Sequence, residues 1–96
     1  MKFNIYFSPK AHKQYQKLDA YIKSKFKLEV LSLEKDPYQK SSILSGKLSS
    51  LRCRKFSFQG VQYRIVYDIN RDTKEVLIIF LGTRENFYKE LTYYIN

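Results

Sequence analysis

Residues 51–82, LRCRKFSFQGVQYRIVYDINRDTKEVLIIFLG, decide the fold of this chain. The stretch contains three strand-like runs separated by two turns, and the second turn falls at residues 70–73. The first two runs hold the clearest alternation of apolar and basic residues in the sequence. Because the side chains of a strand point alternately to its two faces, each of these runs predicts one mainly apolar face and one basic face.

The first turn determines whether the two basic faces coincide. A two-residue loop at Gln59 and Gly60 places Arg54 opposite Ile65 and mixes the faces. A three-residue loop that begins one residue earlier places Arg54 opposite Arg64, with Gly60 in the left-handed position that closes such a hairpin. Since a one-residue slip moves every side chain to the other face, burial of the apolar residues favours the three-residue loop.

This register predicts one open face that carries several basic side chains, while Cys53 and Ile65 face the helices. The polar residues expected on the open face are Arg52, Arg54, Arg64 and Gln62. Like charges placed close together cost stability, so the cluster indicates an anionic ligand rather than a structural purpose. Arg84, which follows the third run, adds a fourth arginine at the end of a strand.

The remaining elements follow from local signals. Residues 76–81 are apolar at every position, which is typical of a strand covered on both faces. Residues 2–7 alternate as a first strand. Two helices are expected to begin after Ser8, which precedes a proline, and after Asp19. The second helix is expected to end at Asp36, which precedes another proline.

The sequence therefore predicts a single α+β domain over residues 1–96. Its sheet is expected to be small, antiparallel-rich and four-stranded, with an N-terminal helical hairpin packed on one face. Apolar spacing over residues 85–95 predicts a short C-terminal helix.

The composition indicates a polyanionic partner. Lysine and arginine number 18 against 9 acidic residues, giving a net charge of +9. A basic protein without such a partner is the alternative. No apolar run approaches the roughly 20 residues that span a bilayer, and no signal peptide is visible. One cysteine and one histidine cannot build a zinc site without several carboxylates, so neither a metal nor a cofactor is expected.

Several segments resemble the RelE/ParE superfamily of bacterial toxins, which belong to type II toxin–antitoxin systems. The resemblance covers nearly the whole chain. Its most specific parts are GVQYRIVY at residues 60–67 and the later combination of Gly82, Arg84 and Tyr88; the LSGKL segment at residues 44–48 also matches. The family's fold, a small antiparallel-rich sheet with two N-terminal helices on one face, agrees with the fold predicted from the pattern.

The resemblance implies two alternative activities. RelE-like members are ribosome-dependent endonucleases that cut mRNA in the A site without a metal, by attack of the ribose 2′-hydroxyl on the adjacent phosphate, and so arrest growth. ParE-like members inhibit DNA gyrase and have no nuclease site. A third possibility is an inactive RNA-binding protein. We expect the RelE-like activity, with ParE-like gyrase inhibition as the main alternative.

For the RelE-like activity, the resemblance implies particular site residues. Arg52, Arg54, Arg64 and Arg84 would bind phosphate and stabilise the charge of the transition state, and Tyr88 would orient the nucleotide or transfer a proton. Lys47 and Gln62 are expected to contact RNA. Arginine at positions 52 and 54 makes a poor general base, because the guanidinium stays protonated at any accessible pH.

The expected partners also follow from the resemblance. They are a cognate antitoxin, the ribosome and its mRNA, with no membrane contact. The toxin–antitoxin complex is expected to bind operator DNA through the antitoxin. The expected location is the bacterial cytoplasm, which the single cysteine fits.

Replacing Tyr88 by phenylalanine separates stacking from proton transfer. If the tyrosine only stacks on a base, Tyr88→Phe keeps most of the activity, because the ring remains. We expect instead that the hydroxyl moves a proton, so that cleavage slows by about 10²–10⁴-fold with ribosome affinity nearly unchanged. Single-turnover cleavage on programmed ribosomes measures this, and equal rates would show that the hydroxyl is dispensable.

Overall fold

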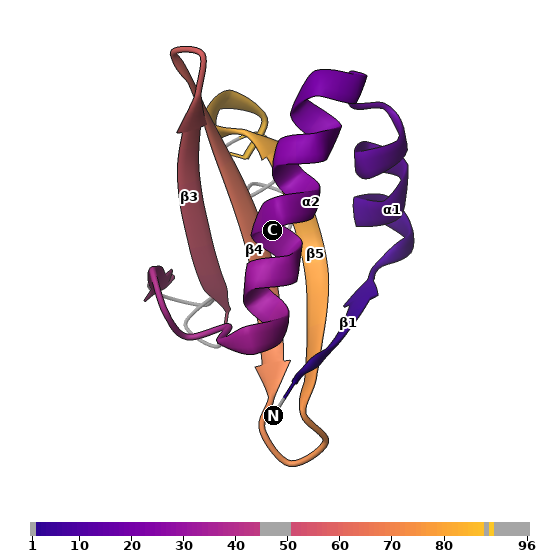
Figure 1. Ribbon diagram of the computed structural model, residues 1–96, viewed down its shortest axis with the longest axis vertical. Helices are drawn as coiled ribbons and strands as arrows, with labels where there is room; N and C mark the ends of the chain where they lie inside the picture. Colours follow the sequence, from indigo (N-terminus) through magenta and orange to yellow (C-terminus); the bar gives the residue numbers. More distant parts are fainter. Residues whose placement is uncertain (1, 45–50, 88, 90–96) are drawn as a thin grey trace.

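The part of the chain that the structure describes forms helices α1 and α2, a short C-terminal helical segment and a five-stranded sheet, in an α+β arrangement (Figure 1). The computed structural model describes residues 2–44, 51–87 and 89. The elements are, in order, β1 (Asn4–Phe7), α1 (Pro9–Gln16), α2 (Ala20–Lys35), β2 (Ser41–Ile43), β3 (Arg52–Phe58), β4 (Val61–Asn70) and β5 (Glu75–Thr83). The strand order is β1-β5-β4-β3-β2, and all neighbours are antiparallel except β1 and β5. The predicted α+β class and helical hairpin are confirmed.

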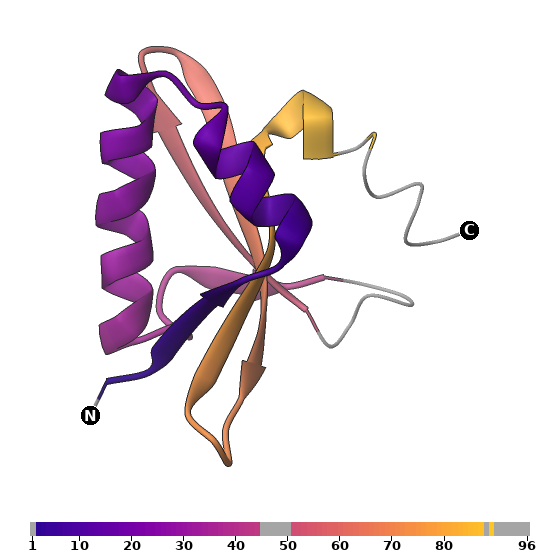
Figure 2. The same cartoon turned by 90° about the vertical axis from the view of Figure 1, so that its right-hand side faces the viewer.

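The sheet has one strand more than predicted. This strand is β2, which pairs with β3 at the edge of the sheet, with Ser41 opposite Arg54. It spans three residues, of which two are serine, so it is too short to show an alternation in the sequence. Residues 84–87 are helical, in agreement with the predicted C-terminal helix, and Figure 2 places this segment on the opposite side of the sheet from α2.

Both helices begin at the predicted residues. The Ser8 hydroxyl accepts a hydrogen bond from the Ala11 amide at 3.1 Å, which satisfies one of the free donors at the start of α1. Helix α2 begins directly after Asp19 and ends at Lys35, before Asp36 and its proline. The residue before a proline disfavours helical backbone, which explains this end.

The hairpin between β3 and β4 closes with a two-residue loop, so the predicted three-residue register is wrong. Arg54 lies opposite Ile65, and Lys55 lies opposite Arg64. Both loop residues are left-handed, with φ of 50° at Gln59 and 78° at Gly60. Positive φ at both central residues defines the type I′ turn, whose twist matches that of the flanking strands.

This register puts Arg54 and Arg64 on opposite faces of the sheet. Ile65 packs in the cluster under the helices, as predicted, but Cys53 belongs to a second cluster on the other face. The predicted open face with Arg52, Arg54 and Arg64 together does not exist. The argument from burial failed because Arg54 is buried among polar partners under α2.

Aromatic rings hold α2 on the sheet. The cross-strand pair Phe56 and Tyr63 is stacked, with ring centroids 5.4 Å apart. Phe26 of α2 meets both rings edge-on, at 4.9 Å and 5.5 Å. Such edge-on and offset pairs add about 0.5–1.5 kcal/mol each beyond the area that they bury.

Arg54 connects α2 and the loop that follows it to β3. Its side chain is 1% exposed. One terminal nitrogen donates to the carbonyls of Gln39, at 2.7 Å, and Asp36, at 3.4 Å. The other donates to the Glu29 carbonyl at 3.4 Å and lies 3.5 Å from the Glu29 carboxylate. A buried cation is tolerated only when it is paired and hydrogen-bonded in this way.

Strand β5 lies inside the sheet, as its apolar sequence predicts, but it is not covered on both faces throughout. Leu77 is 41% exposed. The register between β4 and β5 changes by one residue after Val66. Val66 pairs with Phe80, and the next residue, Tyr67, pairs with Ile78, so Ile79 has no partner in β4 and forms a β-bulge. Ile79 and Phe80 therefore both pack in the cluster on the face away from the helices.

We expect Arg54→Met to lower the free energy of unfolding by about 2–3 kcal/mol, because three carbonyls lose a charged donor. The matched control is Lys55→Met, the exposed neighbour on the other face, which should stay within about 0.5 kcal/mol of the wild type. Urea unfolding of both variants measures the difference. Equal stability of the two variants would mean that the cost of burying the cation cancels its hydrogen bonds.

Candidate functional site

The face of the sheet turned away from the helices, called here the open face, carries a different set of polar side chains from the predicted one. Lys55 and Ser57 of β3 lie opposite Arg64 and Gln62 of β4. Arg84 follows β5 and begins the C-terminal helical segment. The hairpin register brings the four strand residues together, because it places the odd residues of β3 beside the even residues of β4.

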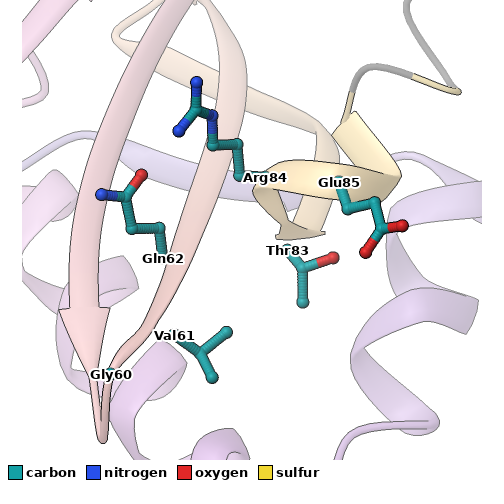
Figure 3. Close-up of a pocket in the computed structure, with 6 residues that line it drawn as sticks. All are labelled: Gly60, Val61, Gln62, Thr83, Arg84 and Glu85. Atoms are coloured by element: carbon teal, nitrogen blue, oxygen red, sulfur yellow. The ribbon is translucent and has the colours of Figure 1, made fainter.

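An open hollow of about 650 Å³ lies where the hairpin tip meets the end of β5. It is lined by Gly60, Val61, Gln62, Thr83, Arg84 and Glu85. In Figure 3 the side chains of Gln62 and Arg84 extend to one side, whereas Val61 and Thr83 point to the other. An amide and a guanidinium directed to the same side can together bind a phosphate or a nucleotide.

Lys55 is the residue that the sequence argument missed. The predicted register placed it on the apolar face, whereas the structure places it exposed and directly opposite Arg64. The signal that identifies it is the turn, because Gln59-Gly60 read as a two-residue loop gives this pairing directly. Two cations that face each other across a strand pair repel, so an anion bound beside Lys55 reduces this repulsion.

Arg64 is held within the second apolar cluster and is 8% exposed. Its guanidinium carbon lies 4.8 Å from the ring centroid of Phe87, in the C-terminal helical segment. Burial raises the pKa of the neighbouring Cys53 thiol, and the positive charges of Arg64 and Lys55 oppose that shift. A raised pKa keeps the thiol protonated, so Cys53 is a packing residue in this arrangement.

The structure separates the four predicted arginines into two groups. Arg64 and Arg84 lie on or beside the open face, whereas Arg52 and Arg54 belong to the helix side. Arg52 lies over the ring of Tyr38, at 4.9 Å, and donates to the Ser41 hydroxyl at 3.1 Å. The predicted residues Lys47 and Tyr88 lie outside the described residues, so their roles stay predictions.

Within residues 2–44, 51–87 and 89, no group of three or more His, Cys, Asp or Glu side chains is placed to hold a metal ion. Across the same residues, no helix is both long and apolar enough to cross a membrane.

Comparison with known proteins identifies the family. Residues 5–92 match the family described as ParE-like toxin of type II bacterial toxin–antitoxin system. The match covers most of the chain, and the chain belongs to this family. The predicted membership of the RelE/ParE superfamily is therefore confirmed. No curated protein matches the sequence.

Solved structures share the fold at low sequence identity. The toxin–antitoxin complex RelBE2 from Mycobacterium tuberculosis matches with a TM-score of 0.74 and 20% identity, over 88% of this chain and 100% of that chain. A mutant E. coli RelE toxin in the free state gives 0.73 and 23% over the full length of both chains. The isolated E. coli RelE toxin gives 0.68 and 23%, over 98% of this chain and 99% of that chain.

Proposed function

We propose that this toxin is a ribosome-dependent endonuclease that cuts mRNA in the A site, with the open face as its catalytic surface. The observation that carries the proposal is the pairing of Lys55 with Arg64 on the same face as Gln62 and beside Arg84. A scissile phosphate at this place meets the exposed cations Lys55 and Arg84, and Arg64 joins them when the ring of Phe87 moves away. Structural likeness to RelE toxins supports the same choice through the fold.

In the proposed cleavage, each of these groups has a separate role. The ribose 2′-oxygen forms a bond to phosphorus, and the bond from phosphorus to the 5′-oxygen breaks, which leaves a cyclic phosphate and a 5′-hydroxyl. The Lys55 ammonium can donate the proton that the leaving oxygen needs, whereas an arginine at this position cannot. Arg84 and Arg64 stabilise the extra negative charge that develops on the phosphate oxygens. Tyr88, expected to orient the nucleotide or transfer a proton, would accept the proton of the 2′-hydroxyl only in its phenolate form.

Arg64 takes part directly only when Phe87 moves. The ring of Phe87 lies over the guanidinium, which is nearly buried. Displacement of the C-terminal helical segment therefore exposes an arginine beside Lys55. Arg54 has no such role in the proposal, because its hydrogen bonds are used inside the protein.

Inhibition of DNA gyrase is the second candidate function. It is favoured by the matched family, which is described as ParE-like. In that case the basic surface would serve binding alone, and no proton donor would be needed on the open face.

A cognate antitoxin is the expected partner for either activity. RelE toxins have been solved in complex with the antitoxin RelB, from E. coli and from Pyrococcus horikoshii. For this chain, a net charge of +9 favours an antitoxin whose toxin-binding segment is acidic. We also retain the predictions of a cytoplasmic location and of operator binding through the antitoxin.

Two assays run side by side test the choice of activity. Toeprinting on a translating ribosome should show cleavage in the A site after the purified toxin is added. A gyrase supercoiling assay with the same preparation should show no inhibition. Inhibited supercoiling without A-site cleavage would replace the proposed nuclease by the gyrase inhibitor.

Lys55→Gln tests the proton donor. We expect single-turnover cleavage to slow by about 10²-fold or more, because both the charge and the transferable proton are lost. Lys55→Arg is the matched control, since it keeps the charge and removes the transferable proton. Loss of cleavage in both variants supports proton donation, whereas activity retained in Lys55→Arg would limit Lys55 to charge stabilisation.

Arg84→Ala should remove toxicity and leave the fold intact. Arg84 is exposed at the end of β5, where a substitution changes stability by about 0.5 kcal/mol or less. Growth after induction, together with the urea unfolding curve of the variant, provides the measurement. Growth arrest equal to that of the wild type, in a variant that is folded, would remove Arg84 from the site.

A further inference from the structure

A second basic cluster lies at the far end of the sheet from the hairpin tip. Two guanidinium groups share one aromatic ring there: the guanidinium carbons of Arg52 and Arg71 are 4.9 Å and 5.5 Å from the ring centroid of Tyr38. Arg71 also donates from Nε to the Tyr38 hydroxyl at 3.1 Å. Because both distances are measured to the same ring, the two guanidinium groups lie close to each other.

The cluster continues into the turn between β4 and β5. Lys74 lies over the ring of Phe3 at 5.1 Å, and Phe3 meets the Tyr38 ring edge-on at 6.2 Å. The rings of Tyr38 and Phe3 thus connect Arg52 and Arg71, at one end, with Lys74 at the other. Arg71 and Lys74 are exposed, and Tyr38 is half-buried.

Internal contacts do not neutralise these charges. Among the residues that the structure describes, no carboxylate lies within ion-pair distance of Arg52 or Arg71. The nearby Asp36 carboxylate accepts hydrogen bonds from the amides of Tyr38 and Gln39. Two fixed guanidinium groups without a carboxylate favour an external anion.

We propose that this cluster binds phosphates of folded ribosomal RNA, separately from the strand that the toxin cuts. This inference rests on the proposed function, which brings the toxin to the ribosome. Guanidinium groups grip phosphate oxygens with two parallel hydrogen bonds, and the contact with Tyr38 fixes the position of each group in advance. Preorganised donors lose less conformational freedom when the ligand binds.

The distance between the two basic surfaces supports two separate RNA contacts. Gln62 lies beside the hollow and Asn70 precedes the turn that carries Arg71, both on β4. At about 3.3 Å per residue, these two ends of the strand are roughly 26 Å apart. One surface can therefore hold the ribosome while the other holds the phosphate that is cut.

The test measures binding of Arg71→Gln to protein-free 16S ribosomal RNA and to vacant 70S ribosomes at several salt concentrations. Lys13→Gln, at an exposed lysine of α1, is the control, because it removes the same charge elsewhere. We expect affinity for both probes to fall about 3- to 10-fold in Arg71→Gln relative to the control. The slope of log affinity against log salt should become shallower by about one.

Cleavage separates this inference from the proposed function. In Arg71→Gln the KM for programmed ribosomes should rise while kcat stays at the wild-type value, since Arg71 lies far from the open face. Equal RNA affinities and equal salt slopes for the two variants would overturn the inference, whether or not the toxin cleaves mRNA. A difference seen with duplex DNA and not with RNA would also overturn it. If the wild-type toxin does not cleave mRNA in the A site but Arg71→Gln still binds RNA more weakly than Lys13→Gln, only the nuclease proposal is overturned.

Discussion

The turn at Gln59 and Gly60 determines which side of the sheet each charge occupies. Both residues are left-handed, with φ of 50° and 78°, and the loop between β3 and β4 is therefore limited to two residues. From that turn, Arg54 falls under α2 and Lys55 falls opposite Arg64. With a loop one residue longer, Arg54 would lie on the same face as Arg64, and Lys55 would lie under α2. Arg54 would then lose the carbonyl partners that allow it to be buried.

Local sequence signals predicted the elements well, but the pairing between them depended on energies that no local pattern contains. Ser8, Asp19 and Asp36 marked helix ends through backbone chemistry that acts within a few residues. To choose the hairpin register, one has to compare the free energy of the fold with Arg54 buried against that of the fold with Arg54 exposed. That comparison depends on the carbonyls of Asp36 and Gln39, which lie 18 and 15 residues away in the sequence.

The candidate site was predicted in part for the same reason. Arg84 and Gln62, which were expected to act in catalysis and RNA binding, both line the hollow, because their places depend on strand ends and on β4 alone. Lys55 was missed and Arg52 was placed on the wrong face, because both depend on the pairing of β3 with β4. Short strands without alternation, such as β2, leave no signal of this kind in the sequence.

Apart from Arg54, the arginines of the chain lie on two separate surfaces instead of one. Arg64 and Arg84, with Lys55, serve the open face near the hairpin tip, and Arg52 and Arg71 meet at Tyr38 near the opposite end of β4. Arg54 belongs to neither, since it connects α2 and the loop after it to β3. A high net charge alone therefore does not define a single binding patch.

The position of Cys53 gives the protein an intrinsic chemical reporter. It is the single cysteine of the sequence, it is 1% exposed, and it shares a cluster with Phe87 of the C-terminal helical segment. A thiol reagent reaches the sulfur only when that cluster opens. The rate of labelling would therefore report the proposed displacement of Phe87 from Arg64, and it could be measured on the unaltered chain, alone or with an antitoxin or ribosomes added.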